Sequence, residues 1–438
     1  MLLLFPCFAT QADNLDFSQA WNQLVRVSDK LKASHYEVAR AKSEKNESDD
    51  LNFPEINLVG SATHLSAPFE TGEQTLASPL PIGSTSFTIP SVELSEQDVF
   101  RSSLQAMWPI YTGGKITAAQ SIRSAMVREK EEQHQIETNK LFVSLVDRYY
   151  GVMVANSAAD TYQELVDSLE KHADHAEKLE AQGQIAKVER LNAQVTLENA
   201  KIKASSARRQ AEMAEIALAR MLHAQHVETR STLFTLSHLP SLNDLTKKTM
   251  HDHPALRLLK AKEDQAQGLI DVQKGGYYPT VFLYGNYTLY EDDSLFSQAE
   301  PDWLVGIGVK IPLLSRSGRG SKVEAAKSAQ LQARHTRAQT QVDLNLLLEQ
   351  SYRQLLQADE ERISLDLSVE LAQENKHLRD IAFTQGLSTS IEKVDAELKL
   401  NAVYMQQLNA RYQYIKAYAR LMSISNQTKQ FIVNSNTK

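Results

Sequence analysis

The sequence is poor in several features that restrict what a chain can be. It contains one cysteine, Cys7, which excludes an intramolecular disulfide framework and any cysteine-based zinc site. No apolar run of about 18 residues occurs, so we expect no transmembrane helix. The formal charge of −7 provides no basic footprint, and stripes of lysine and arginine interleaved with aromatics are lacking. The lack of a basic surface argues against nucleic-acid binding.

Glycine and proline are also scarce, while long tracts are rich in Ala, Leu, Glu, Lys, Gln and Arg, as is typical of long helices. Between Ile116 and Gln182 there is no proline, and Gly151 is the only glycine. This stretch predicts one helix of about 65 residues, on the order of 100 Å long. Coiled-coil spacing, alternating three and four, relates Tyr162, Leu165, Leu169, His172, Ala176 and Leu179. So long a helix needs a partner, and residues 185–222 predict an antiparallel return helix.

One stretch of the chain occurs twice. It begins Gln182-Gly183-Gln184 in the first copy and Gln385-Gly386-Leu387 in the second. The chemical class is kept in the pairs Val188 with Ile391, Glu189 with Glu392, Arg190 with Lys393, Leu191 with Val394 and Ala193 with Ala396. Each copy lies between two helical patterns, so both predict the turn of a helical hairpin. Self-similarity of this kind indicates a repeat architecture.

The repeat extends over nearly the whole chain. An offset of 225 relates residues 17–60 to 242–285, and an offset of 203 relates residues from 109 onward to those from 312 onward. We predict a first repeat over 13–235, with strands near 54–65 and 99–109 and the hairpin turn near 183. The second covers 236–424, with strands near 279–290 and 302–312 and the turn near 386. Each repeat also begins with a helical pattern, over 15–50 and 242–273.

Three segments do not follow the repeat. Residues 1–12 are apolar and end in small residues, which resembles the remnant of a signal peptide; a frayed apolar terminus is the alternative. Residues 66–98 are rich in Ser, Thr, Pro and Gly without a period, and we expect an exposed loop that accounts for the extra length of the first half. Residues 425–438 predict a polar, disordered C-terminal tail.

The four predicted strands alternate in polarity. Near 279–290, one face carries Val281, Leu283, Tyr287 and Leu289, which suit lipid, and the other carries Asn286 and Thr288, which suit water. Aromatics stand at the strand ends, where a membrane-interface belt belongs: Trp108, Trp303, Tyr277, Tyr278 and Tyr290. Four strands cannot close a barrel, and lipid does not tolerate open edges, so closure in a membrane would require other chains. Taken alone, the strands also fit the edge of a small β-sandwich.

The order of helix, strand pair and long helical hairpin, present twice, resembles the TolC-like outer-membrane efflux proteins. The Trp108-Pro109 and Ile311-Pro312 strand exits and the two Gly-centred turns carry the resemblance. It implies a mainly α fold with a membrane β-barrel: a homotrimer with a twelve-stranded barrel in the outer-membrane lipid of a Gram-negative bacterium, continued by an α-helical coiled-coil tube into the periplasm. It further implies a passive exit duct of a tripartite efflux or type I secretion system, with no cofactor. The partners would be a periplasmic adaptor (membrane fusion) protein and an inner-membrane transporter of the RND or ABC type.

By the same resemblance, the turns would form the adaptor-docking tip, at Gly183, Gln184, Gly386 and Leu387. Val188, Glu189, Glu392 and Asp395 would fall at a pore constriction that favours cations. Solvated charges near a turn are the other interpretation of these acids. The chain departs from the family pattern at Gln184, where a leucine is common, and at Ser388, where some members carry a basic residue.

Two other classes of protein compete with a channel. An enzyme or metal protein is disfavoured because the pairs His172 with His175 and His251 with His253 have no third ligand placed nearby. The segment from Ser315 to Gly320 lacks the Gly-Lys-Ser/Thr ending of a phosphate loop and reads as a strand-to-helix joint with a basic collar. A soluble periplasmic coiled-coil scaffold or adaptor without a pore would explain the helices but not the duplicated strands.

Overall fold

The computed structural model describes residues 13–67, 69–72, 74–77, 86–89, 91, 93–292, 301–313, 318–385 and 387–436. The predicted signal-peptide remnant, Gly386 and Ser315 to Ser317 lie outside these ranges. The chain divides into two compact units. We call them the sheet unit (Arg40–Arg128, Ala261–Arg334) and the helical unit (Met1–Ala39, Glu129–Lys260, His335–Lys438). In the described ranges, every helix is too short or too polar to span a lipid bilayer.

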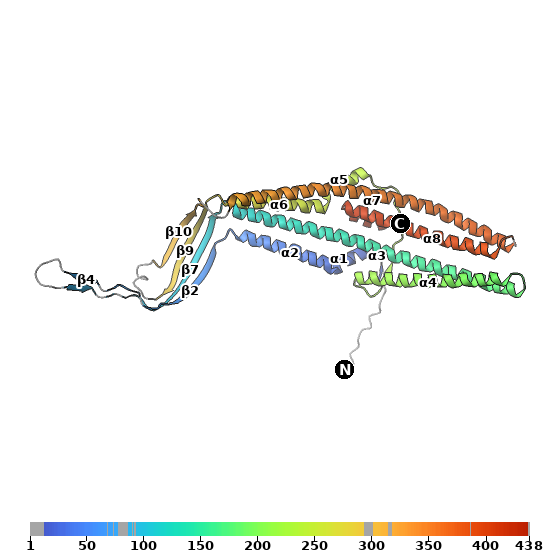
Figure 1. Cartoon of the computed structure of the whole chain (residues 1–438), viewed down its shortest axis with the longest axis horizontal. Helices are drawn as coiled ribbons and strands as arrows, with labels where there is room; N and C mark the ends of the chain where they lie inside the picture. The colour runs from blue at the N-terminus through green and yellow to red at the C-terminus, as the bar shows by residue number, and fades with distance from the viewer. Residues whose placement is uncertain are drawn as a thin grey trace, which may run out of the picture. The chain divides into compact units, whose positions relative to one another are not determined.

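The sheet unit is built on four antiparallel strands, which Figure 1 shows side by side. They are β2 (Glu55–His64), β7 (Asp98–Tyr111), β9 (Thr280–Glu291) and β10 (Trp303–Lys310), in the order β10-β9-β7-β2. The two repeats meet where β7 pairs with β9, with Gln105 opposite Asn286. Within the described residues β2 and β10 each have one neighbour in this sheet, so both of its edges are open.

The two faces of this sheet differ in polarity. One exposes large apolar side chains, among them Ile56, Leu58, Leu104, Leu283, Tyr287, Val305, Ile307 and Val309. Val305 and Ile307 lie two residues apart on β10, on the same face, and are 65% and 66% exposed. A period of two therefore separates an apolar from a polar surface, as the sequence predicts for β9. An apolar sheet face this exposed indicates that something other than water covers it.

The prediction of an exposed loop over 66–98 is wrong in part, since the segment contains paired strands. The backbone pairs again beyond β2 and β7, first as β3 (Phe69–Glu70) with β6 (Glu93–Ser95), then as β4 (Gln74–Ala77) with β5 (Ser86–Ile89). Figure 1 shows β4 beyond the end of β2. Because two arms that leave a paired hairpin are already adjacent, their backbones can continue the hydrogen-bonded ladder without a side-chain period.

Four helices pack together next to the sheet. They are α2 (Asp29–Asp50), α6 (Pro254–Gly275) and the first turns of α3 (Lys115–Ala181) and α7 (Arg319–Thr384). Arg123 of α3 pairs with Glu44 of α2 at 3.0 Å, and Arg128 pairs with Asp264 of α6 at 3.0 Å. A Cβ atom on Gly268 would lie 2.5 Å from Ile122 Cγ1, so glycine permits the close approach of α6 to α3.

Both helical patterns that begin the repeats are interrupted, which the sequence reading missed. α1 (Phe17–Val27) is separated from α2 at Ser28, and α5 (Leu242–Asp252) from α6 at His253. The two junctions have extended backbones with ψ of 112° and 124°. Pro254 disfavours helical geometry in the residue before it. At the matching place Ser28 accepts a bond from the Leu31 N–H at 3.4 Å, so its hydroxyl caps α2.

The helical unit contains two hairpins of matching lengths. α3 (67 residues) is followed by α4 (Lys187–Met221, 35 residues), and α7 (66 residues) by α8 (Ser390–Ile424, 35 residues). Alanines at 200 and 204 of α4 lie buried against Leu165 and Leu169 of α3 and Val394 of α8. Small side chains at these positions let the helix axes approach closely, as in a coiled coil.

An aromatic core joins the hairpins farther from the turns. Phe17 of α1 lies edge-on to Phe142 and Tyr149 of α3, with ring centroids 5.8 and 5.5 Å away. The Tyr149 hydroxyl donates to the Leu15 carbonyl at 2.8 Å. That contact holds β1 (Asp13–Leu15), which pairs in parallel with β8 (Val227–Thr229).

The prediction of a disordered C-terminal tail is wrong. Residues Thr428–Asn436 form α9, and Phe431 is fully buried in the aromatic core. Its ring stacks on Tyr418 with centroids 5.4 Å apart, and Asn434 donates to the Tyr418 hydroxyl at 2.6 Å. The segment is polar overall, but one large aromatic side chain is enough to order a single helix when a cavity lined by other rings receives it.

Candidate functional sites at the hairpin turns and on the polar sheet face

The first hairpin turn connects α3 to α4. Gly183 adopts φ of +68°, and its N–H and that of Gln184 donate to Glu180 and Leu179 carbonyls at 2.8 and 2.9 Å. These bonds satisfy the carbonyls left free at the end of α3. Arg190 of α4 forms an ion pair with Glu180 across the turn. The helix α4 begins after Ala186, which has no side-chain cap.

The second turn connects α7 to α8 and is better capped. Thr389 accepts a bond from the Glu392 N–H at 3.2 Å, and the Glu392 carboxylate accepts one from the Thr389 N–H at 3.0 Å. This reciprocal pair is a capping box. Leu387 is 78% exposed at the turn, which leaves an apolar side chain in contact with solvent. Ser388, which departs from the family pattern, donates to Glu392 at 2.7 Å.

Ion pairs brace the second turn on both helices. Arg379 of α7 lies 3.2 Å from Glu392, and Lys393 lies 3.4 Å from Asp380. The hydrogen bond from Ser388 is the main cause that lowers the pKa of the Glu392 carboxyl. Burial by itself would raise the pKa of Asp380, but bonds from Lys376 and Lys393 outweigh it and the pKa is lowered. Both carboxylates are therefore anionic partners of fixed cations at neutral pH.

A groove of about 760 Å³ separates the two turns. The His172 Nε2 atom of α3 lies 2.8 Å from the Ser390 Oγ of α8, which links the two hairpins. Phe383 packs against the rings of His172 and His175, each with centroids 6.2 Å away. Burial, together with the positive charge of Lys393 and the neighbouring His175, lowers the pKa of His172. His172 and His175 thus serve as packing and hydrogen-bonding groups here.

The four predicted constriction residues do not share one surface. Glu189 and Asp395 line a smaller cavity of about 230 Å³ between α4 and α8, together with Asn192. Val188 is 59% exposed and does not line it, and Glu392 is engaged in the capping box. The structure therefore brings together one acid from each repeat, and it separates Glu392 from Asp395.

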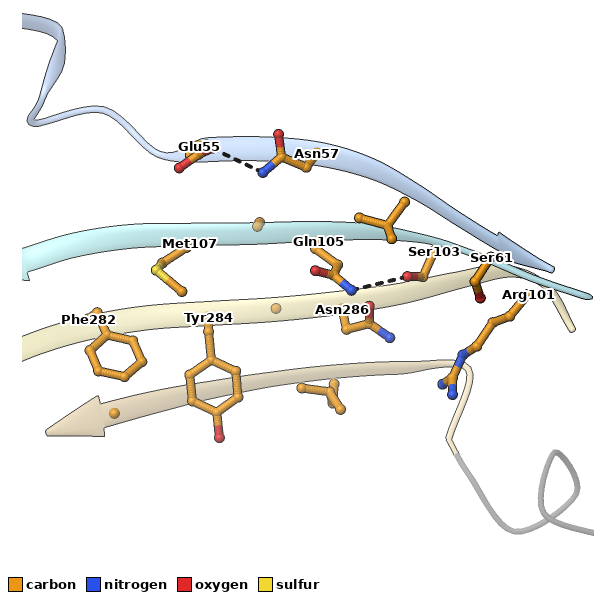
Figure 2. Close-up of a pocket in the computed structure, with 15 residues that line it drawn as sticks. Glu55, Asn57, Ser61, Arg101, Ser103, Gln105, Met107, Phe282, Tyr284 and Asn286 are labelled. Carbon is orange, nitrogen blue, oxygen red and sulfur yellow. Dashed lines mark hydrogen bonds between the residues drawn. The ribbon is translucent and has the colours of Figure 1, made fainter. Parts of the chain in front are cut away.

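The polar sheet face forms a cavity of about 890 Å³ (Figure 2). Its lining includes Asn57 and Ser61 of β2, Arg101, Ser103 and Gln105 of β7, and Tyr284 and Asn286 of β9. Gln105 donates to Ser103 at 3.5 Å, and Arg101 lies 3.7 Å from Glu291. Phe282 and Tyr284 lie over Gly308 and Gly306 of β10, where a Cβ would come within 2.4 and 2.6 Å of the rings. Glycines thus let two aromatic rings lie over β10, on a wall that carries both polar side chains and apolar ones such as Val59 and Met107.

The predicted interface aromatics occupy both ends of the sheet. Trp108 lies toward the helix end of β7, where its indole N–H donates to the Asn52 carbonyl at 2.8 Å. Tyr277 and Tyr278 follow α6 at the same end, and Arg319 lies over the Tyr277 ring at 5.2 Å. At the opposite end are Trp303, which begins β10, and Tyr290, whose hydroxyl donates to Asp292 at 2.6 Å. All five are at least 44% exposed, which suits an interface with one apolar and one wet side.

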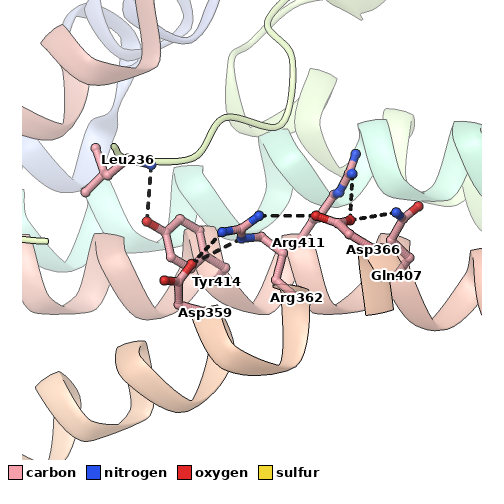
Figure 3. A network of polar contacts seen from close by, with 7 residues as sticks. All are labelled: Leu236, Asp359, Arg362, Asp366, Gln407, Arg411 and Tyr414. Carbon is pink, nitrogen blue, oxygen red and sulfur yellow. Dashed lines mark hydrogen bonds and ion pairs between the residues drawn. The ribbon is translucent and has the colours of Figure 1, made fainter. Parts of the chain in front are cut away.

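A charged network inside the second hairpin was not found from the sequence (Figure 3). Asp366 of α7 accepts bonds from Gln407 and Arg411 of α8 at 2.7 and 2.8 Å, and Arg362 lies 3.3 Å from it. Burial alone would raise the pKa of Asp366, but bonds from Arg411 and Gln407 lower it. The spacing of Arg362 and Asp366, four residues apart, is a sequence signal for an ion pair on one helix. Only the packing of α8 against α7 shows that Arg411 and Gln407 also bind Asp366.

The histidine pair at 251 and 253 is structural. His253 accepts a bond from the Ala255 N–H at 3.1 Å, which caps the start of α6, and burial lowers its pKa to about 4. Within the described ranges there is no cluster of three or more His, Cys, Asp or Glu that could hold a metal ion.

Comparison with known proteins agrees with this architecture. The family described as "Outer membrane efflux protein" matches residues 21–223 and 245–427, one segment for each repeat. No curated protein sequence matches the chain. The fold is similar to the outer membrane protein VceC from Vibrio cholerae, with 14% identity over 93% of this chain and 95% of that one, and a TM-score of 0.75. It is also similar to the open state of the MtrE channel of Neisseria gonorrhoeae, with 14% identity over 94% of this chain and 89% of that one and a TM-score of 0.75. For the CmeC channel of Campylobacter jejuni, the identity is 14% over 96% of this chain and 89% of that one, and the TM-score is 0.70.

The chain belongs to the outer membrane efflux protein family, since the match covers most of both repeats. It has the TolC-like fold, and its function is that of an outer-membrane efflux channel that extends into the periplasm. The family is one of trimeric channels in tripartite systems, not of enzymes.

Proposed function

We propose that the chain is the passive exit duct of its tripartite system, in which a periplasmic adaptor docks at the hairpin turns and an inner-membrane transporter of the RND or ABC type supplies the energy. The observation that carries this proposal is the sheet with two open edges, one apolar face and one polar face. A lone sheet of this kind would leave unpaired backbone groups at β2 and β10.

Three copies would satisfy both edges if β2 of each pairs with β10 of the next. The twelve strands would then close on themselves with the polar cavity of Figure 2 toward the lumen and the exposed apolar face toward lipid. The aromatics at the two sheet ends would lie at the two membrane interfaces.

The docking proposal concerns Gly183, Gln184, Gly386 and Leu387. The turn at Gly183 and Gln184 is exposed, and Leu387 presents an apolar side chain to solvent. An exposed apolar side chain at a fixed turn fits the coiled-coil end of another protein better than it fits water.

The constriction proposal rests on Glu189 and Asp395, which line the same cavity; Val188 and Glu392 precede them in the sequence and do not line it. Repeated by threefold symmetry, two acids per chain would form a ring that attracts cations and is blocked by divalent ones. In planar bilayers, the double change Glu189→Ala with Asp395→Ala should raise single-channel conductance and weaken block by Mg²⁺. Glu198→Ala is the matched control, because Glu198 is an acid of the same helix that pairs with Lys201 at 3.4 Å. Equal conductance and block in the double variant and the wild type would place both acids outside the pore.

The duct itself is tested by extraction from outer membranes. We expect a detergent-stable trimer that conducts ions in a planar bilayer without any energy source. A monomer that gives no conductance would exclude the proposed assembly.

A further inference from the structure

A further cavity of the sheet unit lies where the sheet joins the helices, and its lining is strongly basic. We call it the junction pocket; its volume is about 370 Å³. Its lining consists of Lys115, Val272, Gln273, Gly276, Thr280, Lys310, Pro312, Arg319 and Lys322. Four of these nine residues are cations and none is an acid.

The junction pocket is held in shape by close backbone contacts. A Cβ on Gly113, whose φ is +67°, would lie 2.7 Å from the Gly275 carbonyl oxygen. A Cβ on Gly275 would in turn lie 2.7 Å from Lys115 Cγ. These glycines bring the start of α3 against the end of α6 and leave the stem of Lys115 along the wall.

Arg319 has a structural role in this pocket. Its guanidinium donates to the carbonyls of Gly276 and Pro312, both at 3.1 Å, and lies over the Tyr277 ring. The three lysines differ from it: in the described part of the chain, Lys115, Lys310 and Lys322 form no ion pair with an acid. Three ammonium groups without a counter-charge around one cavity create a positive potential that favours an anion.

The junction pocket lies on the polar face of the sheet. Lys310 pairs with Thr280, and the next positions on that face, Gly308 and Phe282, line the larger polar cavity. Residues two apart on a strand share a face. Lys310 therefore faces the same side as Asn286 and Gln105, not the apolar side, and Lys115 and Lys322 line the same pocket from α3 and α7.

We propose that the junction pocket binds the phosphate group of a small anionic solute that passes through the channel. Lys115, Lys310 and Lys322 donate charge-assisted hydrogen bonds to the phosphate oxygens, and Arg319 fixes the wall. In a trimer the site occurs three times around the lumen, so it enriches anions at this level, whereas the Glu189 and Asp395 cavity would enrich cations at the turns. This site adds a ligand to the channel and is independent of which adaptor docks.

The test uses the purified trimer in detergent and inorganic phosphate as the probe, with binding measured by ³¹P NMR line broadening. The triple variant K115Q/K310Q/K322Q should weaken phosphate binding by about tenfold or more, because several charge-assisted bonds are lost together. Lys274→Gln is the matched control: Lys274 is an exposed lysine of α6 that does not line the pocket, and its removal should leave binding unchanged. Lys322→Arg, which keeps the charge, should also retain binding.

Equal broadening with the wild type and the triple variant would overturn the site. A second arm uses dihexanoyl-phosphatidylglycerol below its micelle concentration: if it binds in a lysine-dependent way and inorganic phosphate does not, the ligand is a lipid headgroup and the solute assignment is wrong. In planar bilayers under a KCl gradient, the triple variant should lower the chloride-to-potassium permeability ratio. Absence of any conductance would count against the assembly proposed above, while the NMR titration would still decide the pocket.

Discussion

The two hairpin turns have the same length and place in the repeat but are stabilised differently. The first has Gly183 at positive φ and the ion pair of Arg190 with Glu180, but no side-chain cap at Ala186. The second depends on side chains, with the Thr389 and Glu392 capping box and the pair of Glu392 with Arg379. Duplication has kept the length of the turn while its side-chain contacts diverged, so we expect the first turn to be sensitive to a change at Gly183 and the second to loss of polar groups.

Gly183→Val should have the largest effect on this comparison. A β-branched residue at positive φ is a strong outlier, and we expect a local cost of about 1–3 kcal/mol. Among the described residues, apart from its chain neighbours, no atom lies within 4 Å of a Cβ at this position, so the cost comes from backbone strain and not from a clash. Hydrogen exchange should quicken in 178–190 while the trimer still assembles, and adaptor-dependent export should be lost.

Gly183→Asn is the control for that change, because asparagine tolerates the left-handed region. It should retain most of the protection from exchange. Loss of assembly in the valine variant would show that the turn is required for folding and would contradict a docking role.

Thr389→Ala should weaken the second turn by about 1 kcal/mol, since it removes the hydroxyl acceptor of the capping box. Exchange of the first-turn amides of α8 should become about fivefold faster. Thr389→Ser keeps the hydroxyl and should behave as the wild type. If alanine and serine variants exchange alike, the cap does not stabilise the turn in solution.

Ala186→Ser should make the first turn more like the second, by about 0.5–1 kcal/mol. Glu189 already occupies the position three residues on, so serine would complete a capping box at α4. Slower exchange in the first turn of α4 is the expected result. Unaltered exchange in this turn would contradict the prediction and would mean that Glu189 remains in its cavity with Asp395 and forms no capping box.

The smallest expected effect is a pH dependence of the contact between the turns. The pKa of His172 is lowered in the fold, so its contribution is fully present above about pH 6.5, the ordinary value, and is lost as pH falls through the lowered folded pKa. Protonation of His172 would place a positive charge beside that of Lys393. The protection factors near Ser390, which compare exchange with the intrinsic rate at each pH, should therefore fall on acidification in the wild type but less so in His172→Gln. Identical pH profiles would assign the effect to other groups.

Much of the fold could be predicted because its periods are long and redundant. The strand patterns, the helices without proline and the doubled glycine turns each occur twice, so each copy supported the other. Errors fell where one local feature outweighed the average: Phe431 orders a polar tail, and Ser28 and His253 interrupt a helical pattern without changing its period. Pro254 was a signal for the break at His253, because proline disfavours helical geometry in the residue before it.

The candidate sites were less predictable because they depend on distances between segments. Glu392 and Asp395 are three apart on one helix, yet one belongs to a cap and the other to a cavity shared with Glu189 of the other hairpin. The basic segment from 315 to 320 was recognised as a collar, but the junction pocket needed Lys115 and Lys310 from two other elements.

The sequence by itself determined the repeat, the helix and strand types and the polarity of each strand face, because these follow from composition and period along the chain. Tertiary structure alone decided which charges meet. Whether an acid caps a helix, pairs with an arginine or lines a cavity depends on atoms of other elements a few ångströms away, and electrostatic energy falls with that distance, not with separation along the chain.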